Sequence, residues 1–398
     1  MQIGTSTLKV LTYVGDIATI NTNTGDVYYS HERVSWFSKR KRLELSVGKC
    51  VLLCVNLKKS DVVPQLNIDN IPVPVKDVTT YLGDQFNSKG TNTDLVEERV
   101  KKGKACIVNS MALCSDITMG IHAVETLLLL YYCLFLAVFL YNAQAWSNLT
   151  KTDLMSLQRV QIKFIKRMFH APSSSSTPLT YLETGILPIE FEINIKQLCF
   201  LHHILTLPSD DPVHHTYMQQ LMYQAPNWGN EIKHLRKKYD LQETDEEVAS
   251  LSKEEWKRLV KRKVRAKALD KLNDEAEGQK NSSNLPRYEN LQRQEYISTL
   301  TPKKARKIFH IRTNTIDLKA VRKYKYGNDT MCRLCSQEPE TIEHVVNDCT
   351  AIDRTCLIDN VFTINCEELD EIAKRCIEFD NKVDALKQSV SCTTNGEP

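Results

Sequence analysis

The chain has 398 residues, of which 42% are hydrophobic and 25% are charged, so a folded protein of two or three domains is expected and an intrinsically disordered chain is excluded. The formal net charge is +3, and the 13 cysteines are mostly scattered singly along a sequence with no recognisable N-terminal signal peptide. These features predict a reducing intracellular location, nuclear or cytoplasmic, and argue against a disulfide framework.

Residues 1–85 are expected to form a small antiparallel fragment of strands with one helix. Short runs rich in β-branched and aromatic residues flank Gly15-Asp16 and predict a hairpin. Further along, the patterns predict an amphipathic helix over Tyr28–Arg42, a buried strand over Cys50–Leu57 and a hairpin over Gln65–Val75 that turns at Asp69-Asn70.

Residues 86–206 are expected to be helical, with helices near 95–113, 121–141, 151–170 and 190–206. The second of these contains the uncharged run Leu127–Tyr141. A helix needs about 20 apolar residues to span a bilayer, and this run is shorter. We interpret it as a fully buried helix, with a membrane span as the alternative, and expect no membrane partner.

The remaining chain divides by charge into a helical connector at 207–300, a basic arm with a Cys/His element at 301–356, and an acidic helix with a tail at 357–398. Gly278–Pro286 is the predicted linker within the connector. The basic arm contains one acid, Asp317, and nine bases before Gly327: Lys303, Lys304, Arg306, Lys307, Arg312, Lys319, Arg322, Lys323 and Lys325.

A short Cys/His element, C-x2-C-x8-H-x4-C, follows the basic arm and comprises Cys332, Cys335, His344 and Cys349. Three thiolates and one imidazole fill the four positions of a tetrahedral Zn²⁺ ion and leave none open for substrate, so the spacing predicts a structural zinc site. Cys356 is a possible substitute ligand, and four unrelated buried residues are the alternative interpretation.

The bases near this element suggest a nucleic-acid partner, RNA or DNA, because cations hold phosphates and aromatic rings stack on unpaired bases. The alternative is a set of charged helix faces that only contact water. The predicted phosphate contacts are Lys163, Lys166, Arg167, Lys303, Lys304, Arg306, Lys307, Arg312, Arg322 and Lys323.

Several stretches, in this order, resemble the reverse transcriptases of non-LTR (LINE-type) retrotransposons. They are Tyr13-Val14-Gly15-Asp16, Ile71-Pro72-Val73, Tyr81-Leu82-Gly83, Tyr141-Asn142-Ala143-Gln144-Ala145-Trp146, Leu182-Glu183, Gly185-Ile186-Leu187-Pro188-Ile189, Ala305-Arg306 with Arg312, and the C-x2-C-x8-H-x4-C element. The resemblance implies the C-terminal half of a polymerase palm at 1–85, a helical thumb at 86–206 and a C-terminal zinc module.

The same resemblance implies RNA-directed DNA polymerase chemistry that this chain departs from. That chemistry uses two metal ions held by clustered carboxylates. Gly15 stands where the family has the first Asp of its hairpin, so Asp16 would be the residual catalytic ligand. The other carboxylate strand and the fingers would lie upstream of Met1. We therefore expect Mg²⁺ to bind only if an intact palm is completed.

For this chain alone we expect nucleic-acid binding, no polymerase activity and no small-molecule substrate. Two alternatives remain open. The first is a host-adopted, zinc-dependent nucleic-acid-binding protein, and the second is a helical scaffold whose zinc site only folds the C-terminus.

Overall fold

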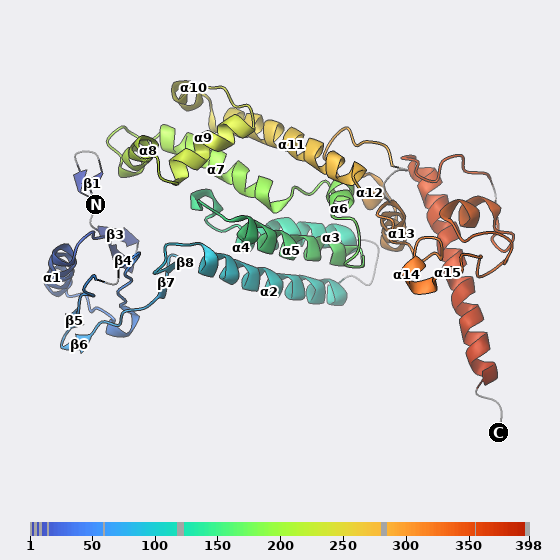
Figure 1. Ribbon diagram of the computed structural model, residues 1–398, viewed down its shortest axis with the longest axis horizontal. Coiled ribbons are helices and arrows are strands. Elements are labelled where there is room, and N and C mark those ends of the chain that lie inside the picture. Colours follow the sequence, from blue (N-terminus) through green and yellow to red (C-terminus); the bar gives the residue numbers. More distant parts are fainter. Residues whose placement is uncertain are drawn as a thin grey trace. The chain divides into compact units, whose positions relative to one another are not determined.

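The computed structural model describes residues 2–3, 6–7, 10–13, 16–58, 60–117, 123–279, 285–354 and 356–394 (Figure 1). The fold is α+β, as predicted, and mostly helical. It forms two compact units. The first unit comprises Met1–Lys102, Phe139–Leu157 and Glu192–Lys263, and the second comprises Gly103–Val138, Gln158–Phe191 and Val264–Pro398.

The described strands form four antiparallel pairs in the first unit, each a separate two-stranded sheet. The pairs are β1 (Gln2–Ile3) with β2 (Ser6–Thr7), β3 (Val10–Tyr13) with β4 (Asp16–Thr19), β5 (Asn67–Ile68) with β6 (Ile71–Pro72), and β7 (Val78–Tyr81) with β8 (Asp84–Asn87). Both predicted hairpins are confirmed, but Asp16, which was predicted to lie in the first turn, pairs with Tyr13 as the first residue of β4. Asp69 and Asn70 have φ angles of 49° and 67°, the positive values that a two-residue hairpin turn of type I′ requires.

The strand predicted over Cys50–Leu57 is wrong. Within it, only Leu52 pairs, through an isolated bridge to Val75. The start of the segment packs on a small cluster formed by Leu66, Ile68 and Val73, whereas its end is exposed. Its apolar side chains therefore serve local packing, and its backbone is bonded at single points, from the Leu52 N–H to the Pro74 carbonyl at 3.0 Å and from the Asn56 N–H to the Ser88 carbonyl at 2.8 Å.

Helices and helical turns make up the rest of the regular secondary structure in the described residues. Those shorter than eight residues are η1 (Val47–Lys49), η2 (Tyr131–Phe135), α4 (Leu136–Phe139), η3 (Ala143–Ala145), α10 (Asp245–Ser250), α12 (Tyr296–Thr299), α14 (Lys323–Tyr326) and η4 (His344–Asp348). The longer helices are α1 (Thr24–Lys41), α2 (Thr93–Ile117), α3 (Ala123–Leu130), α5 (Lys151–Met168), α6 (Thr177–Thr184), α7 (Ile189–Leu205), α8 (Pro212–Met222), α9 (Trp228–Lys238), α11 (Lys253–Glu277), α13 (Pro302–Arg312) and α15 (Cys366–Thr394).

In the first unit, the turn between β7 and β8 is tied to the segment that follows α4. The Asp84 carboxylate accepts a hydrogen bond of 3.0 Å from Asn142 Nδ2 and forms an ion pair with Arg99. Arg99 also donates to the Gly83 carbonyl at 3.0 Å and lies 5.1 Å from the ring centre of Tyr141. Asp84 and Asn142, which are 58 residues apart in sequence, are thus in direct contact.

In the second unit, the buried amide of Gln161 on α5 joins three further segments. Its Nε2 donates to Tyr131 Oη at 2.7 Å and to the Leu187 carbonyl at 2.8 Å. Its Oε1 accepts from Tyr181 Oη at 2.7 Å and from the Ile189 N–H at 2.8 Å. All four hydrogen-bonding positions of this amide are satisfied, as a buried polar side chain requires.

The apolar run at 127–141 is divided into α3, η2 and α4. Tyr131, Phe135 and Phe139 are fully buried, but Leu129 and Tyr132 are 61% and 48% exposed. One face of the run is thus buried, and the prediction of burial all round is wrong. None of the helices in the described part of the chain is long and apolar enough to cross a membrane.

A buried ion pair links α6 to α13 in the second unit. Arg312 Nε donates to Glu183 Oε1 at 2.6 Å, and both side chains are almost completely excluded from solvent. Burial disfavours the charge of Arg312, but the Glu183 carboxylate holds the pKa of the guanidinium above its ordinary value. Arg312 also donates to the Thr363 carbonyl at 3.2 Å, and Tyr288 Oη donates to Glu183.

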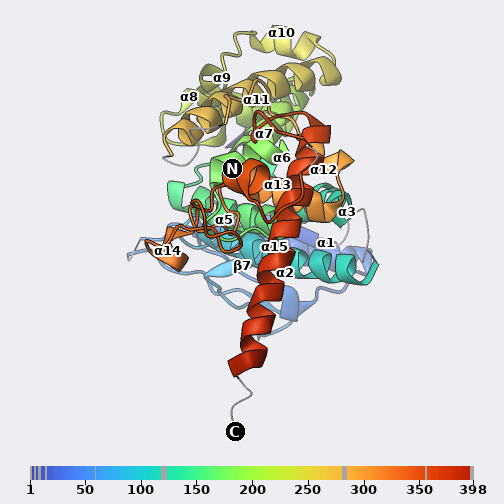
Figure 2. The ribbon, with the colours of Figure 1, turned by 90° about the vertical axis from the view of Figure 1, so that its right-hand side faces the viewer.

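The basic helix α13 packs along the acidic helix α15, and the two lie side by side in Figures 1 and 2. Lys304 pairs with Asp370 and Lys307 pairs with Asp380. On its other side, α13 stacks Phe309 on the Phe169 ring, with 4.1 Å between ring centres. The opposite charges of the basic arm and the acidic tail therefore compensate each other within the chain.

The variant Arg312→Met is expected to lower the free energy of unfolding of the second unit by about 3–5 kcal/mol, because it leaves the buried Glu183 carboxylate without its counter-charge. The matched control is Lys271→Met, which removes the more exposed Lys271–Glu190 pair of 3.3 Å and should change the stability by less than about 1 kcal/mol. Urea unfolding, monitored by hydrogen exchange of α13, measures the free energy of unfolding of both variants. Equal losses of stability in the two variants would contradict the conclusion that the buried pair contributes more than the exposed one.

Candidate metal centre and cationic surface

The first two candidate metal ligands lie on a tight backbone turn. Met331 and Pro339 form an antiparallel bridge that closes the turn, and the Cys332 N–H donates to the Glu338 carbonyl at 2.8 Å. Ser336 adopts a φ angle of 55°, which turns the chain sharply just after Cys335. The turn brings the two thiols of the C-x2-C pair to the same side.

The other two candidate ligands flank one helical turn. The His344 N–H donates to Thr341 Oγ1 at 3.1 Å, which caps the turn, and the Cys349 N–H donates to the His344 carbonyl at 2.7 Å. The hydrogen bond from residue i+5 to residue i makes η4 a π-helical turn, so a histidine and a cysteine five residues apart lie on one side.

The four predicted ligand atoms converge. The sulfur atoms of Cys332, Cys335 and Cys349 and a ring nitrogen of His344 all lie within 4.8 Å of one another. Cys332 Sγ and Cys349 Sγ are 3.8 Å apart, and Cys335 Sγ is 3.2 Å from His344 Nε2. Zn–S bonds of about 2.3 Å at tetrahedral angles place two sulfur atoms about 3.8 Å apart. The Cys332–Cys349 separation matches this value.

We refer to these four residues as the Cys3His cluster. Cys332, His344 and Cys349 are buried and Cys335 is half-buried, so a bound ion would be shielded from solvent. The chain supplies four ligands and leaves no open coordination position. Such a site stabilises structure and does not activate water.

The imidazole is oriented by a carboxylate outside the cluster. His344 Nδ1 lies 3.2 Å from Glu338 Oε2, which leaves Nε2 directed at Cys335. Metal-binding histidines commonly donate their second ring N–H to such a partner. A second grouping of possible ligands, Glu338, Asp348 and the same His344, has both carboxylates exposed, so the Cys3His cluster is the more shielded candidate metal site.

The protein environment shifts the pKa values of Cys349 and Cys335 in opposite directions. Burial raises the pKa of Cys349 to about 12, and the neighbouring Cys332 and Cys335 thiols add to this shift. Burial also acts to raise the pKa of Cys335, but hydrogen bonds from the Gln337 backbone, from Cys332 and from His344 outweigh it and lower this pKa to about 7. A metal ion that bound these thiolates would therefore displace protons, and its affinity would fall as the pH is lowered.

An ion pair between the half-buried Arg333 and the buried Glu340 fixes the turn that holds Cys332 and Cys335. Arg333 lies between the two cysteines and donates to both carboxylate oxygens of the fully buried Glu340, with its Nη2 at 2.6 Å. The same guanidinium donates to the Asp317 carbonyl at 2.6 Å. This pair was not predicted from the sequence, although a charged residue between the two cysteines was a detectable signal.

Two other predicted ligands lie outside the cluster. Cys356 belongs to neither group of possible metal ligands in the described part of the chain, so it does not substitute for a member of the cluster. Asp16 is exposed at the start of β4, opposite Tyr13, and likewise belongs to neither group. Gly15 lies outside the described residues.

The ten predicted phosphate contacts divide into three sets. Arg312 and Lys166 are buried, the first against Glu183 and the second with its Nζ donating to the Ser173 and Ser175 carbonyls at 2.8 and 2.6 Å. The prediction that these two side chains contact phosphate is wrong, because their charges are used in contacts inside the protein and are not presented to a ligand. Four are half-buried in contacts within the unit: Lys304, Arg306, Lys307 and Arg322.

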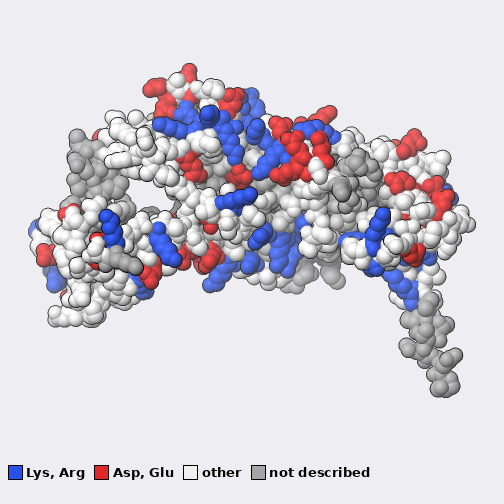
Figure 3. All heavy atoms as spheres, viewed as in Figure 1, with Lys and Arg blue, Asp and Glu red and all other residues white. Residues whose placement is uncertain are grey.

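The third set comprises Lys163 and Arg167 on α5, Lys303 on α13 and Lys323 on α14, which we call the four exposed cations. Each side chain is exposed and makes no ion pair with another described residue. Around α13, α14 and α15, Figure 3 shows basic side chains interspersed with acidic ones on the face in view. The cationic surface is thus smaller than the charge count of the sequence predicts.

No protein family, curated protein or solved structure matches this chain in any of the three comparisons made.

The variant Cys349→Ser is expected to reduce zinc bound per chain to below about a tenth of the wild-type value, because the remaining thiols and imidazole cannot complete the tetrahedron. Cys356→Ser makes the same chemical change seven positions away and should retain the metal. Elemental analysis of both purified proteins, with hydrogen exchange over 330–349, measures the effect. Equal zinc contents in the two variants would exclude Cys349 as a ligand.

Proposed function

We propose that this chain is a nucleic-acid-binding protein derived from the reverse transcriptase of a non-LTR retrotransposon, and that it does not synthesise DNA by itself. The observation on which the proposal chiefly rests is the convergence of the Cys3His cluster, whose ligand atoms lie within 4.8 Å of one another. A compact zinc module beside cationic helices is an arrangement that proteins use to bind single-stranded nucleic acid.

Contacts between the stretches that resemble the reverse-transcriptase family support the proposed derivation of this chain from such an enzyme. In the second unit, Glu183 and Arg312 come from two stretches that resemble the family and pair at 2.6 Å. In the first unit, Asp84 follows the Tyr-Leu-Gly stretch and accepts a hydrogen bond from Asn142 in another. Motifs that were gathered by chance in one sequence would have no reason to contact one another.

The four exposed cations are the proposed phosphate contacts. Lys163, Arg167, Lys303 and Lys323 all belong to the second unit, as does the Cys3His cluster. The stacked pair Phe169 and Phe309 joins the end of α5 to α13, which are the elements that present three of these cations. A polyanion bound there would contact a surface whose shape is determined by buried side chains.

The ion pairs between α13 and α15 favour one alternative, a helical scaffold with a purely structural zinc site. Lys304 and Lys307 are neutralised by Asp370 and Asp380, so a large part of the basic arm is already compensated. A scaffold would show no salt-sensitive affinity for nucleic acid. A host-adopted binding protein would bind nucleic acid in the same way that we propose, and only its history would differ.

Binding of a fluorescent single-stranded RNA to the full chain is expected to weaken by at least about 50-fold between 50 and 200 mM salt, because the four exposed cations alone account for that change on a single strand. Lys303→Ala combined with Lys323→Ala should reduce the slope of log affinity against log salt by about 1.4, since two contacts are lost. Fluorescence anisotropy at four salt concentrations gives these slopes.

The control for this experiment combines Lys382→Ala with Lys387→Ala on α15, which removes the same charge from lysines that pair with Glu378 and Asp384. It should leave the slope unchanged. A wild-type affinity with no dependence on salt would refute nucleic-acid binding and favour the scaffold.

Primer extension by the purified chain with Mg²⁺ or Mn²⁺ is expected to give no incorporation above background. Two-metal catalysis needs clustered carboxylates, and Asp16 is a single exposed carboxylate that belongs to neither described group of possible ligands. Restoring the family residue with Gly15→Asp is not expected to be sufficient. Nucleotide incorporation by the unmodified chain would overturn the proposal that this chain does not synthesise DNA by itself.

A further inference from the structure

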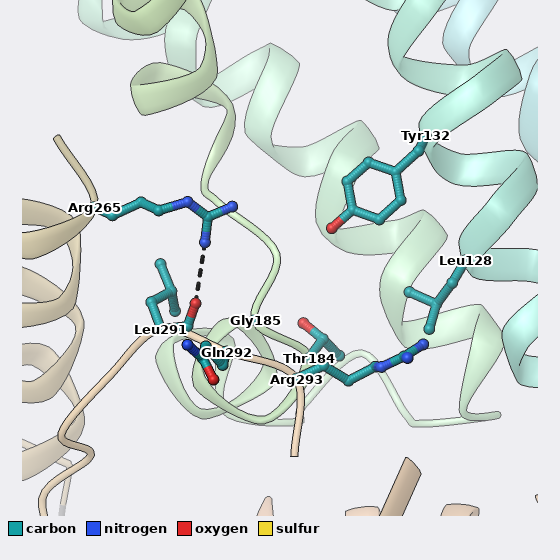
Figure 4. A pocket seen from close by; sticks show the side chains of 8 residues that line it. All are labelled: Leu128, Tyr132, Thr184, Gly185, Arg265, Leu291, Gln292 and Arg293. Atoms are coloured by element: carbon teal, nitrogen blue, oxygen red, sulfur yellow. Dashed lines mark hydrogen bonds between the residues drawn. The ribbon is translucent and has the colours of Figure 1, made fainter. Parts of the chain in front are cut away.

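A cavity of about 390 Å³ opens in the second unit at a place that neither the Cys3His cluster nor the four exposed cations explain (Figure 4). Its walls come from α3 and η2, from the end of α6, from α11 and from the segment 291–293. The volume lies within the range of about 300–1,000 Å³ that is usual for small-ligand sites. Four separate segments form it, so the sequence alone could not predict it.

An aromatic side chain forms one wall of the cavity. Tyr132 lies in the π-helical turn η2, a distortion that is frequent at functional sites, and its side chain is 48% exposed. The buried Tyr131 ring meets it edge to face, with 5.1 Å between ring centres and an angle of 82° between the planes. Tyr131 is itself held by Gln161, so the exposed ring has a fixed support.

Positive charge lines the other sides. Arg265 donates from Nη1 to the Leu291 carbonyl at 3.0 Å, which positions its guanidinium at the cavity. Figure 4 shows the Arg265 guanidinium and the Tyr132 and Thr184 hydroxyl groups directed toward the same space, and the Arg293 side chain extending toward Leu128 on the side opposite Arg265. None of the lining residues is acidic.

Gly185 allows the 291–293 segment, which forms the last wall of the cavity, to lie close to the end of α6. Gly185 ends α6 with a φ angle of 64°, and a Cβ atom added to it would lie 2.3 Å from the Arg293 nitrogen and 2.4 Å from the Gln292 carbonyl carbon. Any side chain at this position would push the 291–293 segment away. The stretch that begins at Gly185 resembles the retrotransposon family, and here it builds the cavity.

We propose that this cavity binds one nucleotide of a single-stranded nucleic acid, with the base stacked on Tyr132 and the phosphate held by Arg265 and Arg293. A half-exposed ring offers the flat surface on which any base can stack, and the two guanidinium groups supply the counter-charge for the phosphate. The proposal rests on the proposed function and adds to it the position at which a base is held.

The test uses the full chain, a fluorescent ten-nucleotide oligouridine and free uridine monophosphate. Tyr132→Ala should weaken oligonucleotide binding about tenfold through loss of stacking, and Tyr132→Phe, which keeps the ring, should stay within about twofold of wild type. Arg293→Ala should reduce the salt slope by about 0.7, the value for one phosphate contact on a single strand. The matched control is Tyr223→Ala, because Tyr223 is 67% exposed and is not part of the cavity lining; it should have no effect.

The outcomes separate this inference from the function on which it rests. If the oligonucleotide binds but Tyr132→Ala and Arg293→Ala do not alter its affinity, the cavity assignment falls and the proposed function stands. If uridine monophosphate binds and loses affinity in both variants while the oligonucleotide does not bind, the cavity assignment stands and the proposed function falls. If neither probe binds, both are overturned. Tyr132→Phe keeps the packing on Tyr131 and should fold normally, so comparison with it shows whether Tyr132→Ala loses affinity through lost stacking or through misfolding.

Discussion

The second unit depends on the buried ion pair between Glu183 and Arg312. A buried charge is tolerated only when it is fully compensated, and Arg312 is compensated by the Glu183 carboxylate and by backbone carbonyl groups. The pair joins α6 to α13, and α13 packs on α15. From α15, the buried Arg375 donates to the Val346 carbonyl of η4 at 2.8 Å. Contacts among α6, α13, α15 and η4 thus connect the helical part of the unit to the Cys3His cluster.

This arrangement changes how the charge of the chain should be interpreted. The sequence has a basic segment followed by an acidic one, which taken alone indicates an uncompensated cationic arm. In the folded chain, Lys304 and Lys307 meet α15 carboxylates, and Arg333 meets Glu340. Only cations that the fold leaves exposed are available to a polyanion. The proposed binding surface is therefore small and defined by packing, and a single stacked nucleotide would add selectivity to an otherwise electrostatic contact.

Sequence reasoning succeeded where the determining interactions are local. The Cys/His spacing predicted the convergence of Cys332, Cys335, His344 and Cys349 because a tight turn and one helical turn bring together residues that are close in sequence. The hairpin at Asp69-Asn70 was likewise predictable from its turn residues. It failed where partners are distant, since nothing near Arg312 in sequence indicates Glu183, 129 residues away. The Tyr132 cavity could not be predicted for the same reason.

X-ray absorption spectroscopy at the zinc edge of the purified full chain tests the central claim most directly, because it reports the atoms bonded to the metal. Coordination by the Cys3His cluster predicts three sulfur atoms at about 2.3 Å and one nitrogen at about 2.0–2.1 Å from a single zinc ion per chain. A first shell made of oxygen or nitrogen alone, or a protein that retains no zinc after purification, would contradict it.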